Sequence, residues 1–147
     1  MRCIYATLFV FLLAGCENHN EVVSPDSITL PGTSTFPVTV SLHIGQTVRV
    51  PQYAFAVRFD SVTSDSRCPL GVECFWQGDG ATGFSIWTDM NPAVACTLHT
   101  TLTPHSVGAG ELRVQLNELD PYPKYPGRIN PTAYVAVLQI TQADTRQ

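Results

Sequence analysis

The residues best suited to chemistry lie between positions 64 and 80, where the sequence reads SDSRCPLGVECFWQGDG. Two cysteines, Cys68 and Cys74, enclose a Pro-Leu-Gly-Val-Glu insert. This spacing matches neither the CxxC pair of zinc ribbons nor that of thioredoxin-like redox motifs. A turn-rich insert of this length can instead bring two Cα atoms within bridging distance. We therefore predict a Cys68–Cys74 disulfide, and neither a metal site nor a bound cofactor.

Cys96 is a further cysteine that competes for this bridge. It lies on the apolar side of an alternating segment, which favours a buried free thiol, but a Cys74–Cys96 pairing that leaves Cys68 free stays open. Cys96 and His99 are three residues apart, so their side chains point to opposite faces of a strand. They are therefore not expected to share a metal ion.

The corner around the cysteines, which contains Asp65, Arg67, Trp76 and Gly78, has two interpretations. In the structural one, Asp65 accepts backbone N–H bonds, and Arg67 binds carbonyls or pairs with Asp65 or Asp60. Val72, Cys74 and Trp76 alternate as in a strand, so Trp76 would pack beside a disulfide at Cys74. In the functional one, Arg67, Asp79 and Trp76 line a ligand groove. We favour the structural interpretation, because corners rich in Gly, Pro and Cys more often fix backbone geometry than carry chemistry.

The same residues carry a resemblance to a known family. The run Asp65-Ser66-Arg67-Cys68-Pro69, followed by Val72, Cys74, Trp76 and Gly78, resembles the DSRCPxxVxCxWxG signature of a group of small uncharacterised bacterial lipoproteins. The Gly45-Gln46 turn and the Leu119–Pro123 loop ahead of a closing strand fit the same group. The resemblance implies a β-rich envelope lipoprotein and brings no catalytic residues. Gly80 departs from the signature and predicts a bulge or a flexible bend.

The N-terminus predicts how such a protein would be held. After Arg2, an apolar run ends in Leu13-Ala14-Gly15-Cys16, which resembles a lipobox. We expect residues 1–15 to be a signal peptide and Cys16 to become a lipid-modified N-terminus that anchors the protein in the membrane. The alternatives are an ordinary secretory signal or a short anchor helix.

The net charge of the chain limits the kinds of molecule that it is expected to bind. The net charge is −4, and Lys124 is the single lysine, which argues against nucleic acid and against a polybasic contact with anionic lipid. Glu17, which follows the lipobox cysteine, weakly favours the outer membrane over the inner one. We therefore expect the protein in the bacterial cell envelope, anchored to the outer membrane and facing the periplasm.

The stretch at 16–37 is polar and broken by prolines, which indicates a tether with a short strand at 28–30. After it, the chain shows the period-two alternation of β-strands. The alternating segments are residues 38–50, 53–60, 81–88, 94–102 and 111–119. Residues 133–140 are apolar on both faces, as is typical of a central strand buried on both sides. No helical stripe is present. We predict one domain at 38–142, an antiparallel β-sandwich of about seven or eight short strands, with a small closed β-barrel as the alternative. A disordered tail is expected at 143–147.

The sequence allows three classes of function. We expect a non-catalytic binding or structural domain. The alternative is an envelope protein-recognition or inhibitor module that acts through the 68–74 loop and the proline-rich 120–131 loop. A hydrolase with an unrecognised site is a third class, although GxSxG, HExxH, Walker A and GxGxxG motifs are all missing from the sequence. Four aromatic residues allow a stacking platform, but core packing is the simpler role for them: Trp76, Trp87, Tyr122 and Tyr125.

Overall fold

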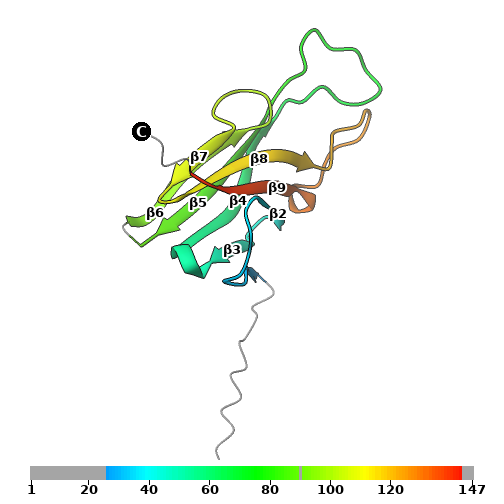
Figure 1. Cartoon of the computed structure of the whole chain (residues 1–147). Helices are drawn as coiled ribbons and strands as arrows, with labels where there is room; N and C mark the ends of the chain where they lie inside the picture. Colours follow the sequence, from blue (N-terminus) through cyan, green and yellow to red (C-terminus); the bar gives the residue numbers. More distant parts are fainter. Residues whose placement is uncertain (1–25, 90, 144–147) are drawn as a thin grey trace, which may run out of the picture.

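The computed structural model describes residues 26–89 and 91–143 of the 147-residue chain. Within these residues the fold consists of two β-sheets that together contain nine strands (Figure 1). The predicted β-sandwich is therefore confirmed, the closed barrel is not formed, and the strand count slightly exceeds the expected seven or eight. The predicted signal peptide, Cys16 and Glu17 lie outside the described residues. No helix in the described part of the chain is long and apolar enough to cross a membrane.

The first sheet has five strands in the order β1-β3-β4-β5-β6. Its neighbouring strands are antiparallel, except that β1 runs parallel to β3. The strands are β1 (Ser27–Thr29), β3 (Thr47–Val50), β4 (Phe55–Asp65), β5 (Gly80–Thr88) and β6 (Asn91–His99).

The second sheet has four strands in the antiparallel order β2-β9-β8-β7. They are β2 (Val38–His43), β9 (Val135–Gln142), β8 (Leu112–Asp120) and β7 (Ser106–Ala109). Two short 3-10 helices, η1 (Pro51–Tyr53) and η2 (Pro131–Ala133), precede β4 and β9. The strand β7 falls in a stretch where the sequence shows no alternation.

The core lies between the sheets and is built from the apolar side of each alternating strand. Fully buried side chains come from both sheets and include Leu42, Phe59, Phe84, Leu98, Leu112 and Leu138. Burial of each such side chain contributes about 1.5–3 kcal/mol. In β8 the register shifts between Leu116 and Glu118. This irregularity moves the buried position from the even residues to Leu119, a change that simple alternation does not predict.

The described part of the segment before β2 packs against the domain, where the sequence predicts a tether. The sequence assigns residues 16–37 to a tether with a short strand at 28–30. The structure forms that strand as β1, and from Asp26 onward the chain contacts the domain. The Leu30 N–H donates to the Arg49 carbonyl at 2.9 Å, and the Phe36 ring meets Tyr53 edge-on at 5.5 Å between centroids. A polar, proline-rich segment can therefore add a strand to the sheet because its few apolar side chains find partners there.

Two connections shape the ends of the sandwich. At one end, β5 ends at Thr88 and β6 begins at Asn91. At the other end, β4 and β5 are joined by the long 66–79 loop, which projects beyond the sheets on the opposite side of the molecule from β1 (Figure 1). This loop contains the signature residues and belongs to the candidate site.

Candidate functional site

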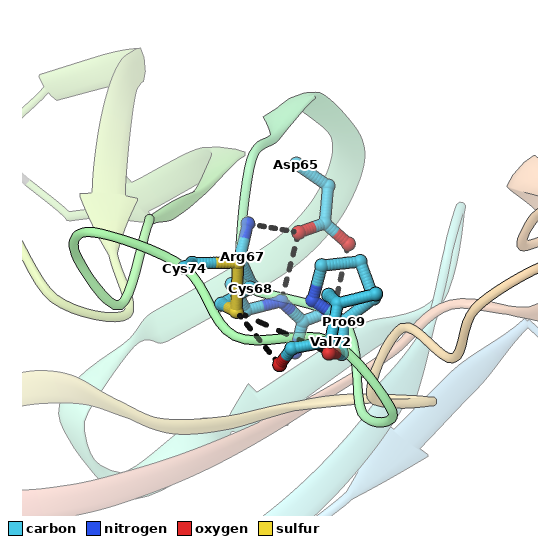
Figure 2. Close-up of a disulfide and its surroundings, with 6 residues drawn as sticks. All are labelled: Asp65, Arg67, Cys68, Pro69, Val72 and Cys74. Carbon is cyan, nitrogen blue, oxygen red and sulfur yellow. Dashed lines mark hydrogen bonds and ion pairs between the residues drawn. A yellow bond between two sulfur atoms is a disulfide. The ribbon is translucent and has the colours of Figure 1, made fainter.

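A disulfide closes the first half of the 66–79 loop (Figure 2). The sulfur atoms of Cys68 and Cys74 are 2.09 Å apart, and their Cα atoms are 5.9 Å apart. Cys96 is a free, half-buried thiol that packs against the core. The predicted Cys68–Cys74 pairing is confirmed and the alternative Cys74–Cys96 pairing is wrong. Burial, together with the charge of Asp60, raises the pKa of the Cys96 thiol.

Asp65 and Arg67 form a buried ion pair beside this disulfide (Figure 2). The Arg67 Nη2 and Nε atoms donate to the two carboxylate oxygens of Asp65 at 2.7 and 2.9 Å, and only 5% and 9% of the Arg67 and Asp65 side chains are exposed. The Arg67 backbone N–H also donates to Asp65. Burial raises the pKa of Asp65, but the bonds from Arg67 and Tyr134 outweigh it and hold the pKa below its ordinary value.

Arg67 also ties this loop to the end of β8. Its Nη1 donates to the Leu119 carbonyl, its Nη2 donates to the Pro121 carbonyl at 3.0 Å, and its guanidinium lies 5.0 Å from the centroid of the Tyr122 ring. The Tyr134 hydroxyl donates to Asp65 at 2.9 Å, and burial together with this carboxylate raises the pKa of Tyr134 to about 12. The ion pair therefore joins parts of the chain more than fifty residues apart in sequence.

Asp79, at the other end of the loop, has a similar role. Its carboxylate accepts bonds from the backbone N–H groups of Thr101 and Leu102 at 2.9 and 3.2 Å, and from His99 Nδ1 at 2.6 Å. Burial raises the pKa of Asp79, and these bonds outweigh that effect and lower it. Asp79 therefore holds the turn after β6, and it does not line a ligand groove.

Glycines allow the two sides of the loop to approach. Gly78 has φ +73°, and a Cβ atom there would overlap the carbonyl of Ser66. Gly80 forms no bulge or flexible bend. It is the buried first residue of β5, where a Cβ would meet Leu119 Cδ2 at 3.0 Å. Both positions need glycine because other segments of the chain pack against their backbone.

Trp76 does not pack as the sequence predicts. Residues 72–76 form no strand, so the expected alternation of Val72, Cys74 and Trp76 does not exist, and all three are exposed. Trp76 is 51% exposed, which is inconsistent with burial against the disulfide. Arg67 and Asp79 are buried while Trp76 is exposed, so these residues do not form the shared groove of the functional interpretation.

The 66–79 loop is paired with the 120–131 loop. The Leu70 N–H donates to the Pro123 carbonyl at 2.9 Å, and the Tyr125 N–H donates back to the Leu70 carbonyl at 3.0 Å. This is a parallel bridge between Leu70 and Lys124. The two loops that the sequence singled out for protein recognition therefore form one continuous surface.

That surface is strongly apolar. Of the nine large apolar side chains that are exposed in the described residues, six lie on these two loops, and we call them the apolar tip: Leu70, Val72, Phe75, Trp76, Tyr122 and Tyr125. Phe75 is fully exposed and Tyr125 is 68% exposed. The sequence singled out three of these aromatic residues but missed Phe75. Its position beside Trp76, in a loop bounded by Pro and Gly, was the available signal.

Beneath the apolar tip lies a polar groove of about 370 Å³, whose lining includes Arg67, Gln77, Thr101, Asn117, Glu118 and Asp120. In the described residues, no group of three His, Cys, Asp or Glu side chains is placed to hold a metal ion. No protein-family model, curated protein or solved structure matches this chain. The likeness to envelope lipoproteins therefore stays a prediction.

Proposed function

We propose that this protein is a lipid-anchored protein of the bacterial cell envelope whose β-sandwich binds a protein partner through the apolar tip. The observation that carries the proposal is the concentration of exposed apolar side chains on two paired loops at one end of the molecule. Contiguous apolar patches of this kind mark interaction sites on soluble domains.

The composition of the apolar tip supports recognition of a protein. One Trp, one Phe and two Tyr contribute to it, and aromatic residues are enriched among the side chains that dominate the energy of protein interfaces. Glu73 and Lys124 lie within the same loops, so the tip carries no excess of positive charge that would draw it to an anionic membrane.

The rigidity of the two loops supports the same conclusion. The Cys68–Cys74 disulfide, the Leu70–Lys124 bridge and the bonds of Arg67 to Leu119 and Pro121 hold the loops in one arrangement. A surface that is ordered before binding loses less conformational entropy when the partner docks. Such rigid loops suit a recognition or inhibitor module.

The position of the predicted anchor also fits. The chain enters the domain at β1, and the 66–79 loop projects from the opposite end (Figure 1). With lipid attached to Cys16, the apolar tip would face away from the membrane that holds the protein. We propose binding rather than catalysis because Asp65, Arg67 and Asp79 are engaged in bonds that hold the loops.

A comparison of tip variants tests the binding role. Full-length protein is purified from envelope extracts after mild crosslinking, as wild type, as Phe75→Ser and as Trp76→Ser, with Val94→Ser as the control at an exposed position on β6. We expect a discrete partner with wild type and Val94→Ser that is lost in both tip variants. The purified partner should then bind the tip variants at least about tenfold more weakly. Identical recovery by all four proteins, or equal binding of the tip to lipid vesicles lacking the partner, would contradict the proposal.

The anchor is tested separately. Globomycin, which inhibits the lipoprotein signal peptidase, should cause an unprocessed precursor to accumulate, and mass spectrometry should find acyl chains on Cys16. An unmodified Cys16 would refute the anchor and leave the role of the apolar tip standing.

A further inference from the structure

The outer face of the five-stranded sheet contains a second feature, which lies on the strands and not on the apolar tip. A hollow of about 580 Å³ opens over β3, β4 and β5, and its lining includes Thr47, Arg49, Ala56, Arg58 and Trp87.

The strand register explains why the sheet is hollow here. Arg49 on β3 lies opposite Ala56 on β4, and Ala56 lies opposite Trp87 on β5. Ala56, the central residue of this row, has a small side chain. The larger side chains of Arg49 and Trp87 flank it, which leaves space above Ala56. In the adjacent row Thr47 lies opposite Arg58. Diagonal neighbours such as Arg49 and Arg58 stand roughly 7–8 Å apart in a sheet.

Arg58 is held in place within this hollow. Its Nε donates to Asp60 at 2.6 Å, Ser85 donates to the other carboxylate oxygen of Asp60 at 2.6 Å, and the guanidinium lies 5.5 Å from the centroid of the Trp87 ring. These contacts leave the terminal nitrogens of Arg58 without a partner among the described residues. A fixed guanidinium with free donors is suited to a two-point bond with an oxyanion.

The charge of the hollow is opposite to that of the protein. The hollow presents the guanidinium groups of Arg49 and Arg58, of which Arg58 pairs with Asp60, while the whole chain has a net charge of −4. Among the described residues Arg49 has neither an ion pair nor a hydrogen bond to its side chain. A positive hollow on an acidic protein is complementary to an anionic ligand.

The strands and side chains around the hollow are better suited to a saccharide ligand than to a peptide. The strands β3, β4 and β5 are each paired on both sides, so no backbone donor or acceptor is free to add a peptide strand. What the face offers instead is side chains: two guanidinium groups, an indole and the hydroxyls of Thr47 and Ser85. Sugar rings combine an apolar C–H face with hydroxyls that such side chains bind.

We propose that this hollow binds an acidic saccharide, with its carboxylate or phosphate group between Arg49 and Arg58 and its ring beside Trp87. The site does not depend on the apolar tip. Ala54, which also lines the hollow, has φ +42°, a conformation that costs a non-glycine residue energy and is found more often at binding sites.

Calorimetric titration of the full chain at low salt tests the proposal. The probes are hexagalacturonate for carboxylate, a phosphorylated pentamannose for phosphate, neutral maltohexaose, and a hexaglutamate peptide. The titration is repeated in a Trp76→Phe background, where Trp87 is the one remaining tryptophan and its emission locates the bound ligand. Arg49→Gln removes one guanidinium, and Arg113→Gln on the other sheet is the matched control.

We expect at least one acidic saccharide to bind and to change the Trp87 emission, with Arg49→Gln weakening binding at least about tenfold and Arg113→Gln leaving it unchanged. The stronger of the two acidic saccharides identifies the anionic group. Four results would overturn the proposal: no binding of either acidic saccharide, equal binding of maltohexaose, tighter binding of hexaglutamate, or binding that leaves the Trp87 emission and the Arg49→Gln variant unaffected.

Discussion

Arg67 is a buried cation that binds Asp65, two residues away, and three groups from a distant part of the chain. Asp65 neutralises its charge, the Leu119 and Pro121 carbonyls accept its remaining donors, and the Tyr122 ring lies against its guanidinium. A buried charge of this kind is tolerated only when it is paired and its hydrogen bonds are satisfied. Arg67 therefore determines how the two loops of the apolar tip are held.

Replacement of Arg67 is predicted to be costly. Arg67→Met leaves the Asp65 carboxylate buried without its cation and should lower the free energy of unfolding by roughly 3 kcal/mol, measured by urea denaturation. Arg58→Met is the matched control, because Arg58 also pairs with an aspartate two residues away but its side chain is 44% exposed. That variant should lose less than about 1 kcal/mol. Equal losses in the two variants would show that Arg67 is not a structural centre.

Asp79 makes a prediction about pH. Its folded-state pKa is lowered, so the stabilisation from its charge is fully present above the ordinary carboxyl value of 3.8 and is lost as the pH falls through the lower, folded-state value. Asp79→Asn should therefore be less stable than wild type by roughly 1–2 kcal/mol at pH 7, and this difference should shrink below the ordinary value. Denaturation at several pH values measures it.

The control is Asp89→Asn, at an exposed position in the turn after β5. It should change stability by less than about 0.5 kcal/mol across the pH range. If the difference between wild type and Asp79→Asn stays constant down to acid pH, the carboxylate of Asp79 is not the stabilising group.

Local residue contacts could be predicted from the sequence, whereas distant ones could not. The Asp65–Arg67 pair was among the expected contacts because the two residues are close in sequence. The acceptors of Arg67 at Leu119 and Pro121, and the bonds of Asp79 to Thr101 and Leu102, depend on how the strands meet. The residue pattern of a single sequence does not specify these contacts between distant segments.

At the scale of elements, the 66–79 loop is a hairpin connection folded back on itself. The disulfide closes its first half, and the Cys68 N–H donates to the Gln77 carbonyl at 2.8 Å across its base. Gly78 permits this close approach of the two sides. The loop is therefore an ordered element, although it contains no regular secondary structure.

Two glycines of this loop give a direct test of that order. Gly71 and Gly78 both have positive φ, at +96° and +73°, but only at Gly78 would a Cβ overlap backbone, since nothing lies closer than 3.9 Å to a Cβ at Gly71. Gly71→Ala should cost roughly 1 kcal/mol of unfolding free energy, from the left-handed conformation alone. Gly78→Ala should cost roughly 3 kcal/mol or more, because the backbone must also move. Similar melting temperatures for the two variants would mean that the base of the loop is not closely packed.

Period-two alternation predicted the strands well, because an antiparallel sheet buries one face of each strand. Its failures have physical causes. The short strand β7 has too few residues to show a pattern, and the irregularity at Asn117 changes which residues of β8 face the core. The segment 72–76 alternates in composition but is too tightly constrained by its disulfide and glycines to pair as a strand.

At the scale of the whole molecule, the sandwich carries two chemically different surfaces, the apolar tip and the arginine-lined hollow. The 66–79 loop, which carries much of the apolar tip, projects at the end opposite β1 (Figure 1). The arginine-lined hollow opens over β3, β4 and β5 of the five-stranded sheet. The sequence named the loops that form the tip but gave no indication that they pair with each other. Nor did it indicate that Trp87 lies apart from the other aromatic residues, on the sheet.

Photocrosslinking in cells tests most directly whether the apolar tip contacts a protein partner. A photocrosslinking amino acid is placed at Phe75 in the full-length protein in living cells, and at Val94 as the exposed control on β6. Irradiation should give one discrete higher-mass adduct from position 75 that is absent from position 94. If position 75 gives no protein adduct, or the same adducts as position 94, the apolar tip is not the recognition surface.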